Sequence, residues 1–108
     1  MTTIRLIGAP TDIGASVRGA GLGPDALRVA GLPDALQMRG LQVTDQGNLP
    51  GPPNPWQPPH AGYRHLPEVV AWNQSIYRAV EAALAHQQLP VLLGGDHCLA
   101  IGSISAVA

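Results

Sequence analysis

The feature of this sequence best suited to chemistry is a histidine that follows a short apolar run and two glycines. The run Pro90–Leu93 is continuously apolar, and Gly94 and Gly95 separate it from Asp96 and His97. Such runs are typical of strands buried on both faces of a parallel sheet, and sites in these sheets form beyond the carboxyl ends of the strands. We therefore predict that His97 lies at the rim of a sheet, where an imidazole can bind a metal or a substrate.

A plain structural interpretation of the same turn stays open. In that interpretation Asp96 caps the helix that follows, and His97 is a polar surface residue. One histidine does not define a metal site, because metal sites in proteins use three or four ligands. The residues alone therefore identify His97 as a candidate ligand without deciding between the two interpretations.

A glycine-rich segment near the N-terminus raises the question of phosphate binding. Residues Gly19–Pro24 lead into a predicted helix, whose N-terminus would favour an anion. The dinucleotide-binding fingerprint requires glycine at its sixth place, which is Pro24 here. We therefore favour a loop with tight turns at the sheet rim over a nucleotide site.

Other polar side chains have simpler explanations than catalysis. Asp12 and Arg18 share the glycine-rich loop and are expected to form a solvent-exposed pair. Asp45 ends a predicted strand, where a site or the capping of a turn would explain it equally well. Cys98 has no evident partner base, so we expect a small buried apolar side chain and not a nucleophile.

The remaining histidines and two aromatic residues are assigned to structure or to the surface. His60 and His65 lie in a proline-rich stretch, and His86 lies in the last turn of a long predicted helix, where a positive charge suits the helix dipole. Trp72 and Tyr77 are expected to pack in the core or in an interface. None of these five is predicted to act on a ligand.

Composition excludes several classes of function. The six basic residues are all arginine and face seven acidic ones, for a net charge of −1, so there is no basic footprint for nucleic acid. Without lysine, neither a Walker-A phosphate loop nor a Schiff-base mechanism is possible. No apolar run of about 20 residues is present, so we expect no membrane partner. One cysteine forms no disulfide framework, so we expect a reducing compartment, the cytoplasm.

The chain alternates between strand and helix patterns. The predicted strands are Thr3–Ala9, Leu41–Asp45 and Pro90–Leu93, and the predicted helices are Pro24–Gly31, Pro33–Arg39, Pro67–Gln87 and His97–Val107. Most of the 11 prolines gather in one stretch, which predicts an internal loop over Gly47–Pro67. This order predicts an α/β fold with a parallel sheet and helices on both faces. Three strands are few for such a sheet, so we expect the front part of a larger domain.

Read together, these segments resemble the manganese-dependent ureohydrolases, and arginase in particular. The resemblance covers the chain through IGAPTDIGASVRGAGLGPDALRVAGL, DQGNLPGPPNPWQPPHAGYRHLPEVVAWN and LLGGDHCLAIGSISA. The last stretch is similar to the family's first metal motif. Cys98 stands where the family commonly has serine, and both side chains are small.

The resemblance implies a three-layer α/β/α sandwich, of which residues 1–108 form the N-terminal part of a single domain. It implies a binuclear Mn²⁺ centre with His97 as the first ligand, and hydrolysis of L-arginine to L-ornithine and urea. It also implies a homo-oligomer, a trimer or hexamer, for the complete protein. The family's other ligand motifs, Asp-x-His-x-Asp and Asp-x-Asp, are absent from this chain. We therefore expect the isolated chain to be inactive, and its substrate-binding residues stay unknown.

Three alternatives are kept. The complete protein could be an agmatinase or another ureohydrolase. The chain could be a non-catalytic module that assembles or binds through exposed apolar faces. It could also be an α/β module that binds an anion at the turn Gly19–Pro24.

Overall fold

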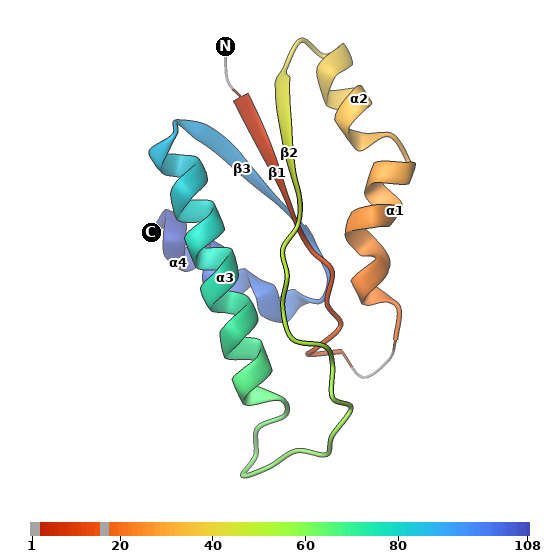
Figure 1. Ribbon diagram of the computed structural model, residues 1–108, viewed down its shortest axis with the longest axis vertical. Helices are drawn as coiled ribbons and strands as arrows, with labels where there is room; N and C mark the ends of the chain where they lie inside the picture. Colours follow the sequence, from red (N-terminus) through yellow and green to blue (C-terminus); the bar gives the residue numbers. More distant parts are fainter. Residues whose placement is uncertain (1–2, 16–17) are drawn as a thin grey trace.

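The computed structural model describes residues 3–15 and 18–108 of the protein and shows a three-stranded parallel sheet between helices (Figure 1). The strands are β1 (Thr3–Ala9), β2 (Gln42–Asn48) and β3 (Gln88–Gly94), in the spatial order β2-β1-β3. Thr3 pairs with Gln42 on one side and Gln88 on the other. β1 is therefore the central strand, which explains why its apolar residues are buried on both faces. The strand predicted to be buried on both faces, β3, is instead an edge strand in the described part of the chain, and of its residues only Leu93 is buried.

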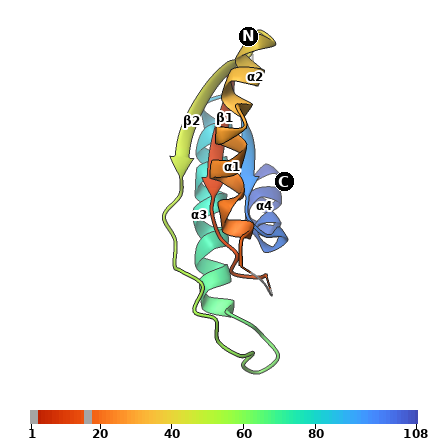
Figure 2. The same cartoon turned by 90° about the vertical axis from the view of Figure 1, so that its right-hand side faces the viewer.

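The helices divide between the two faces of this sheet. They are α1 (Gly23–Val29), α2 (Leu32–Met38), α3 (Leu66–Ala85) and α4 (Ala100–Val107), with short 3-10 turns η1 (Ala20–Leu22) and η2 (His97–Leu99). Figure 2 shows α1 and α2 in front of the strands and α3 behind them. α4 packs against α3. The predicted three-layer α/β/α architecture is confirmed.

Each face of the sheet has its own apolar cluster. Ile7 and Ala9 of β1 pack with Trp72 and Ile76 of α3. Alternate residues of β1 point the other way and pack with the α2 side, in a cluster that contains Ile4, Leu6, Leu93, Leu32 and Leu36. The period-two alternation of a strand produces this division. Trp72 is buried as expected, whereas Tyr77 is 40% exposed and lies outside both clusters.

Several predicted element boundaries need correction. β1 has the bounds predicted from its apolar pattern, but β2 runs on to Asn48 and β3 runs from Gln88 to Gly94. Backbone pairing with β1 extends both strands into polar residues and glycine that the apolar pattern leaves out. The segment predicted as one helix from His97 begins as the 3-10 turn η2, and α4 starts only at Ala100.

The predicted loop Gly47–Pro67 is too long at both ends. Its first residues, Gly47 and Asn48, belong to β2, and its last two begin α3, so the loop spans residues 49–65. It is anchored where Trp72 Nε1 donates to the Pro52 carbonyl at 2.9 Å, and a Cβ at Gly51 would collide with the Trp72 ring. Over the described residues, none of the helices combines the length and apolarity needed to cross a bilayer.

Candidate functional site

The turn after β3 and the loop after β1 lie side by side at the carboxyl edge of the sheet. We call residues 10–22 the rim loop; two of its residues, Ser16 and Val17, lie outside the described part of the chain. The Asp96 N–H donates to the Thr11 carbonyl at 3.1 Å, and the Gly95 N–H donates to the Ala20 carbonyl at 3.3 Å. Two backbone hydrogen bonds thus join the segment that carries His97 to the rim loop.

The topology makes this edge the place where a ligand site is expected. β1 and β3 are neighbours, but β1 leads into α1 on one face of the sheet and β3 leads into α4 on the other (Figures 1 and 2). A crevice opens between parallel strands whose connections leave on opposite faces, and ligands of α/β proteins bind there. The predicted position of His97 at the rim is therefore the switch point of the sheet.

Glycine is required at the start of the turn. Gly95 has φ 75°, a conformation that side chains disfavour. A Cβ there would lie 2.6 Å from the Ala9 carbonyl oxygen and 2.9 Å from that of Thr11. The close approach of this backbone to β1 is what brings His97 to the strand ends.

His97 itself is exposed and uncommitted. It lines a pocket of about 370 Å³ together with Gly94, Gly95, Asp96 and Ser103, among others. Among residues 3–15 and 18–108, no group forms a hydrogen bond with its imidazole. Both ring nitrogens are therefore available for a metal ion or a substrate, as the metal-ligand interpretation requires.

Asp96 caps the turn, as the structural interpretation of the motif predicts. Its Oδ1 accepts from the Cys98 N–H at 2.9 Å, which is an N-cap contact for η2. Its Oδ2 accepts from the Gly14 N–H at 2.7 Å, across the rim loop. Both carboxylate oxygens are thus engaged, so Asp96 shapes the turn and His97 is the group left open.

Cys98 lies in surroundings that disfavour a reactive thiolate. It is half-buried and packs beside the larger apolar cluster. Burial, together with the neighbouring Asp96 carboxylate, raises the pKa of the Cys98 thiol to about 12. The reactive thiolate is therefore scarce at neutral pH, in line with its predicted role as a small apolar side chain.

The expected pairing of Asp12 with Arg18 is wrong. Among the described residues no ion pair joins them. Asp12 Oδ1 instead accepts from Asn54 Nδ2 at 3.1 Å, and the Arg18 guanidinium stacks on Trp56, 4.8 Å from the ring centroid. The proline-rich loop crosses the rim loop and supplies both partners, a long-range contact that spacing does not reveal.

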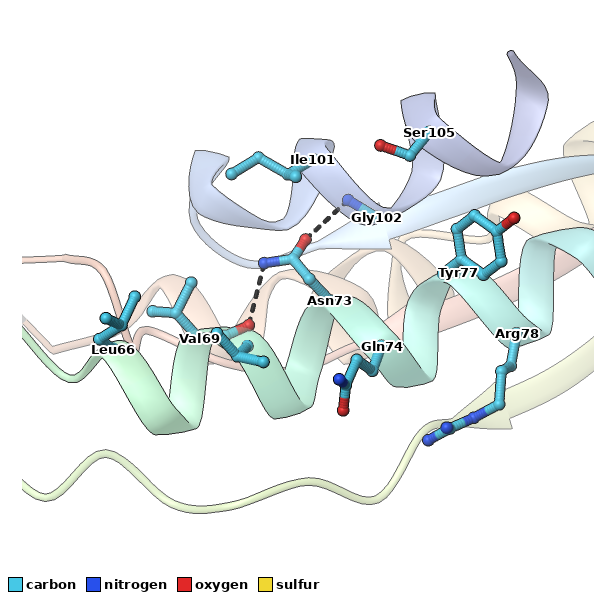
Figure 3. Close-up of a pocket in the computed structure, with 10 residues that line it drawn as sticks. Leu66, Val69, Asn73, Gln74, Tyr77, Arg78, Ile101, Gly102 and Ser105 are labelled. Carbon is cyan, nitrogen blue, oxygen red and sulfur yellow. Dashed lines mark hydrogen bonds between the residues drawn. The ribbon is translucent and has the colours of Figure 1, made fainter.

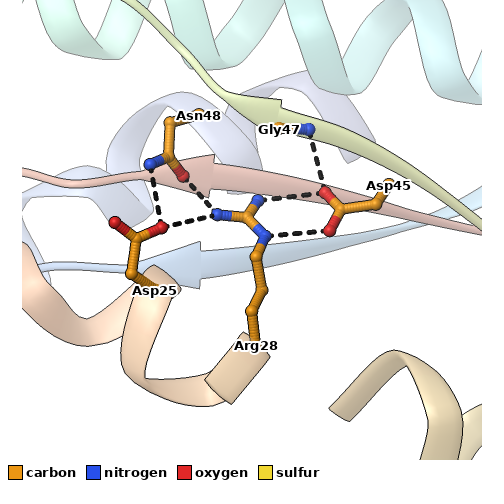
Figure 4. A network of polar contacts seen from close by, with 5 residues as sticks. All are labelled: Asp25, Arg28, Asp45, Gly47 and Asn48. Atoms are coloured by element: carbon orange, nitrogen blue, oxygen red, sulfur yellow. Dashed lines mark hydrogen bonds and ion pairs between the residues drawn. The ribbon is translucent and has the colours of Figure 1, made fainter. Parts of the chain in front are cut away.

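A second polar network joins α1 to the end of β2 (Figure 4). Arg28 donates to both carboxylate oxygens of Asp45, from Nε at 2.8 Å and from Nη2 at 3.0 Å. Its Nη1 also donates to Asn48 at 2.6 Å and Asp25 at 3.2 Å. Hydrogen bonding to Arg28 lowers the pKa of Asp45, and the same contact raises the pKa of Arg28.

Sequence reasoning found only part of this network. Asp45 does not end the strand or cap a turn after it, because it lies inside β2; it accepts from the Gly47 N–H at 2.8 Å, beside an irregularity in the pairing with β1. The partnership with Arg28 was missed. One signal was available, since Asp25 and Arg28 are three residues apart on one helix and so lie on one face. Which strand end that face meets depends on the order of the strands.

Two of the other histidines have structural roles. His65 is buried; its Nδ1 lies 2.9 Å from the Ile13 carbonyl oxygen, and its Nε2 accepts from the Gln57 N–H at 3.0 Å. A carbonyl only accepts, so the proton is assigned to Nδ1. His86 bonds the Ala82 carbonyl through Nδ1 at 2.7 Å, just past the end of α3.

A larger pocket lies between α3 and α4 but has little to offer chemistry (Figure 3). Its volume is about 490 Å³, and its lining is mainly apolar. Asn73 bridges the two helices there: its Oδ1 accepts from the Gly102 N–H at 2.8 Å, and its Nδ2 donates to the Cys98 carbonyl at 3.1 Å. Asn73 thus anchors α4 and the turn before it to α3.

Comparison with known proteins identifies the family. The family model described as "Arginase family" matches residues 2–108. The chain belongs to the arginase family. It is 38% identical over 105 residues to the arginase of Brucella melitensis, covering 96% of this chain and 34% of that protein. It is 37% identical over 108 residues to the arginase of Staphylococcus aureus, covering 97% of this chain and 36% of that protein.

A solved arginase shares the fold. The native structure of the arginase from Bacillus caldovelox superimposes with a TM-score of 0.90 at 32% identity, over 99% of this chain and 36% of that one. The resemblance stated from sequence is therefore confirmed. This arginase-family chain spans about a third of the length of the relatives that it matches.

The arginase family is generally manganese-dependent, and the residues present fit such a centre only as one part of it. In the described part of the chain, no group of three or more His, Cys, Asp or Glu side chains gathers to hold a metal ion. His97 supplies one open nitrogen ligand at the switch point, whereas the nearby Asp96 and Asp12 already accept hydrogen bonds. A complete centre would need ligands in addition to these residues.

Proposed function

We propose that this chain is the N-terminal part of an arginase that hydrolyses L-arginine to L-ornithine and urea with bound Mn²⁺. The family match over residues 2–108 supports this proposal, as do the relatives named arginase. The observation that carries it is the exposed His97 imidazole at the switch point, in the pocket after β3. His97 is proposed as a metal ligand.

In this proposal the chain's own residues hold and orient one ligand. Gly95 lets the turn approach β1, Asp96 closes the turn, and His97 presents a ring nitrogen to the rim. A bound pair of Mn²⁺ ions would supply a hydroxide at neutral pH and polarise the guanidinium group. No residue described here is proposed to exchange a proton with the substrate.

Replacing His97 in the complete protein tests this assignment. We expect His97→Ala to weaken Mn²⁺ binding and to lower urea release, each by more than about a hundredfold, because even indirect supports of metal ligands contribute about 10- to 100-fold. His60→Ala is the matched control, since His60 is an exposed histidine of the proline-rich loop. Metal content by mass spectrometry and urea release from L-arginine are the measurements. Retention of both by His97→Ala would overturn the proposal.

Two further comparisons refine the proposal. The isolated 108-residue chain is expected to release no urea and to hold no stoichiometric Mn²⁺, because one imidazole is too few ligands for the ion. For the complete protein, L-arginine is expected to be a far better substrate than agmatine. The reverse preference would assign it to the agmatinase alternative.

A further inference from the structure

One peptide group of the rim loop connects two side chains that are distant in sequence. The carbonyl of Ile13 accepts from His65 Nδ1 at 2.9 Å, and the N–H of Gly14 donates to Asp96 Oδ2 at 2.7 Å. This carbonyl and this N–H belong to the same peptide bond. A continuous chain of hydrogen bonds therefore runs from the proline-rich loop, through the rim loop, to the turn that carries His97.

Asp96, at one end of this series of hydrogen bonds, contacts the backbone on both sides of His97. Asp96 Oδ1 accepts from the N–H of Cys98, the residue after His97, while its own N–H donates to the Thr11 carbonyl at 3.1 Å. The backbone on both sides of His97 is thus held by Asp96. The direction in which His97 leaves the turn follows from these contacts.

The charge of Asp96 is balanced by N–H groups and not by a cation. Among the residues that the structure describes, no arginine or histidine forms an ion pair with it. Hydrogen bonds to a carboxylate are stronger than neutral ones, and hydrogen bonds in series polarise one another. A buried His65 that donates to the far end of the peptide therefore strengthens the bond that Gly14 makes to Asp96.

We propose that Asp96 is a positioning residue for His97, and that His65 supports it through the Ile13–Gly14 peptide. The proline-rich loop then helps to set how the candidate metal ligand is presented. This inference rests on the proposed function, in which His97 binds Mn²⁺. It assigns roles to Asp96 and His65 that are separate from metal binding: both carboxylate oxygens of Asp96 and both ring nitrogens of His65 already make hydrogen bonds.

The first variant is Asp96→Asn in the complete protein. Both partners of Asp96 are N–H donors, so an amide can accept from one but presents its NH₂ group to the other. We expect the dissociation constant for Mn²⁺, measured by titration calorimetry, to rise about 10- to 100-fold. We also expect kcat to fall and KM for L-arginine at saturating Mn²⁺ to stay within about twofold. Asp34→Asn, on α2, is the control and should match the parent.

Hydrogen exchange at the Gly14 amide tests the same contact, and this measurement requires neither metal binding nor activity. The Gly14 amide should exchange faster in Asp96→Asn than in the parent, and at the parental rate in Asp34→Asn. Unchanged exchange at Gly14 in Asp96→Asn would overturn the hydrogen-bond chain itself.

A double-mutant cycle separates positioning from general stability. If Asp96 acts through His97, Asp96→Asn should change Mn²⁺ affinity by less than about twofold when His97 is already alanine. A loss of equal size in both backgrounds would show that Asp96 acts on the fold or on the metal by another route, and would overturn the proposal.

The His65 arm has its own conservative variant. Asparagine tolerates the left-handed φ of 54° at this position and keeps an N–H for the Ile13 carbonyl, whereas alanine loses it. We expect His65→Ala to weaken Mn²⁺ binding several-fold. His65→Asn should recover most of the affinity, with the two variants having the same melting temperature. Equal affinities in the parent, His65→Ala and His65→Asn would remove His65 from the proposal.

The parent protein distinguishes the two levels of failure. A complete protein that binds no Mn²⁺ and releases no urea contradicts the proposed function, and the inference falls with it. A parent that does both, with an Asp96→Asn variant that binds Mn²⁺ equally well, contradicts the inference alone.

Discussion

Two polar networks lie at the same edge of the sheet, and they differ in what they leave free. Around Arg28, side chains pair with side chains: one guanidinium bonds Asp45, Asn48 and Asp25 (Figure 4). Around Asp96, a carboxylate is held by backbone N–H groups of Gly14 and Cys98. The first network satisfies its own charged groups, whereas the second ends beside an exposed imidazole.

The two networks therefore have different roles: the Arg28 network holds two elements together, and the Asp96 network positions a side chain. The Arg28 network joins a helix to a strand end, and its charges are opposite and in contact, so it has little left to offer a ligand. The Asp96 network fixes the backbone around His97 but, among the described residues, makes no hydrogen bond to the His97 side chain. A charged cluster at a sheet rim is thus a candidate site only where some donor or acceptor stays uncommitted.

The largest expected effect comes from replacing Arg28, the centre of the first network. We expect Arg28→Ala to lower the free energy of unfolding of the complete protein by about 2–3 kcal/mol, because Asp45 loses two hydrogen bonds from a charged donor and Asn48 loses one. Arg39→Ala is the matched control, since Arg39 is an exposed arginine at the end of α2, and should change it by less than about 0.5 kcal/mol. Urea denaturation measures the free energy of unfolding of both variants. Equal effects of the two substitutions would contradict a stabilising role of the Arg28 network.

Two glycines give a sharper contrast between the networks. A Cβ at Gly8 would collide with the Asn48 side chain and lie 3.0 Å from Arg28 Nη2, so Gly8→Ala should cost about 1–2 kcal/mol of stability. A Cβ at Gly14 would lie 2.9 Å from Asp96 Oδ1, so Gly14→Ala should mainly weaken Mn²⁺ binding. Denaturation and Mn²⁺ titration on both variants test the contrast. If Gly8→Ala mainly weakened Mn²⁺ binding and Gly14→Ala mainly lowered stability, the two networks would have the opposite roles.

The smallest effect is a dependence on pH. Hydrogen bonding to Arg28 lowers the folded-state pKa of Asp45 below its unfolded value. The stabilisation is therefore complete above about pH 4, the ordinary pKa of aspartate, and is lost as the pH falls through the folded-state pKa. With Asp45 30% exposed, we expect about 1 kcal/mol. Denaturation at pH 3 and pH 6 should show a smaller difference in Asp45→Asn than in the parent, and an unchanged difference would refute this origin.

Local patterns predicted the elements better than they predicted the contacts. The apolar run of β1, the long stripe of α3 and the glycine turn before His97 are all visible in consecutive residues. Arg28 was overlooked because its partner Asp45 is on a different element, 17 residues away. His65 was assigned to structure or to the surface, and its burial and its link to Asp96 depend on the path of the proline-rich loop.

By itself, the amino-acid sequence determined the alternation of strands and helices and the family, because these depend on periodicity and on motifs within one segment. Only the tertiary structure decided which polar groups meet. The strand order β2-β1-β3 brings the ends of β1 and β3 together, and the proline-rich loop then places His65 against the rim loop. Hydrogen bonds act over about 3 Å, so such contacts exist only once segments distant in sequence have been packed side by side.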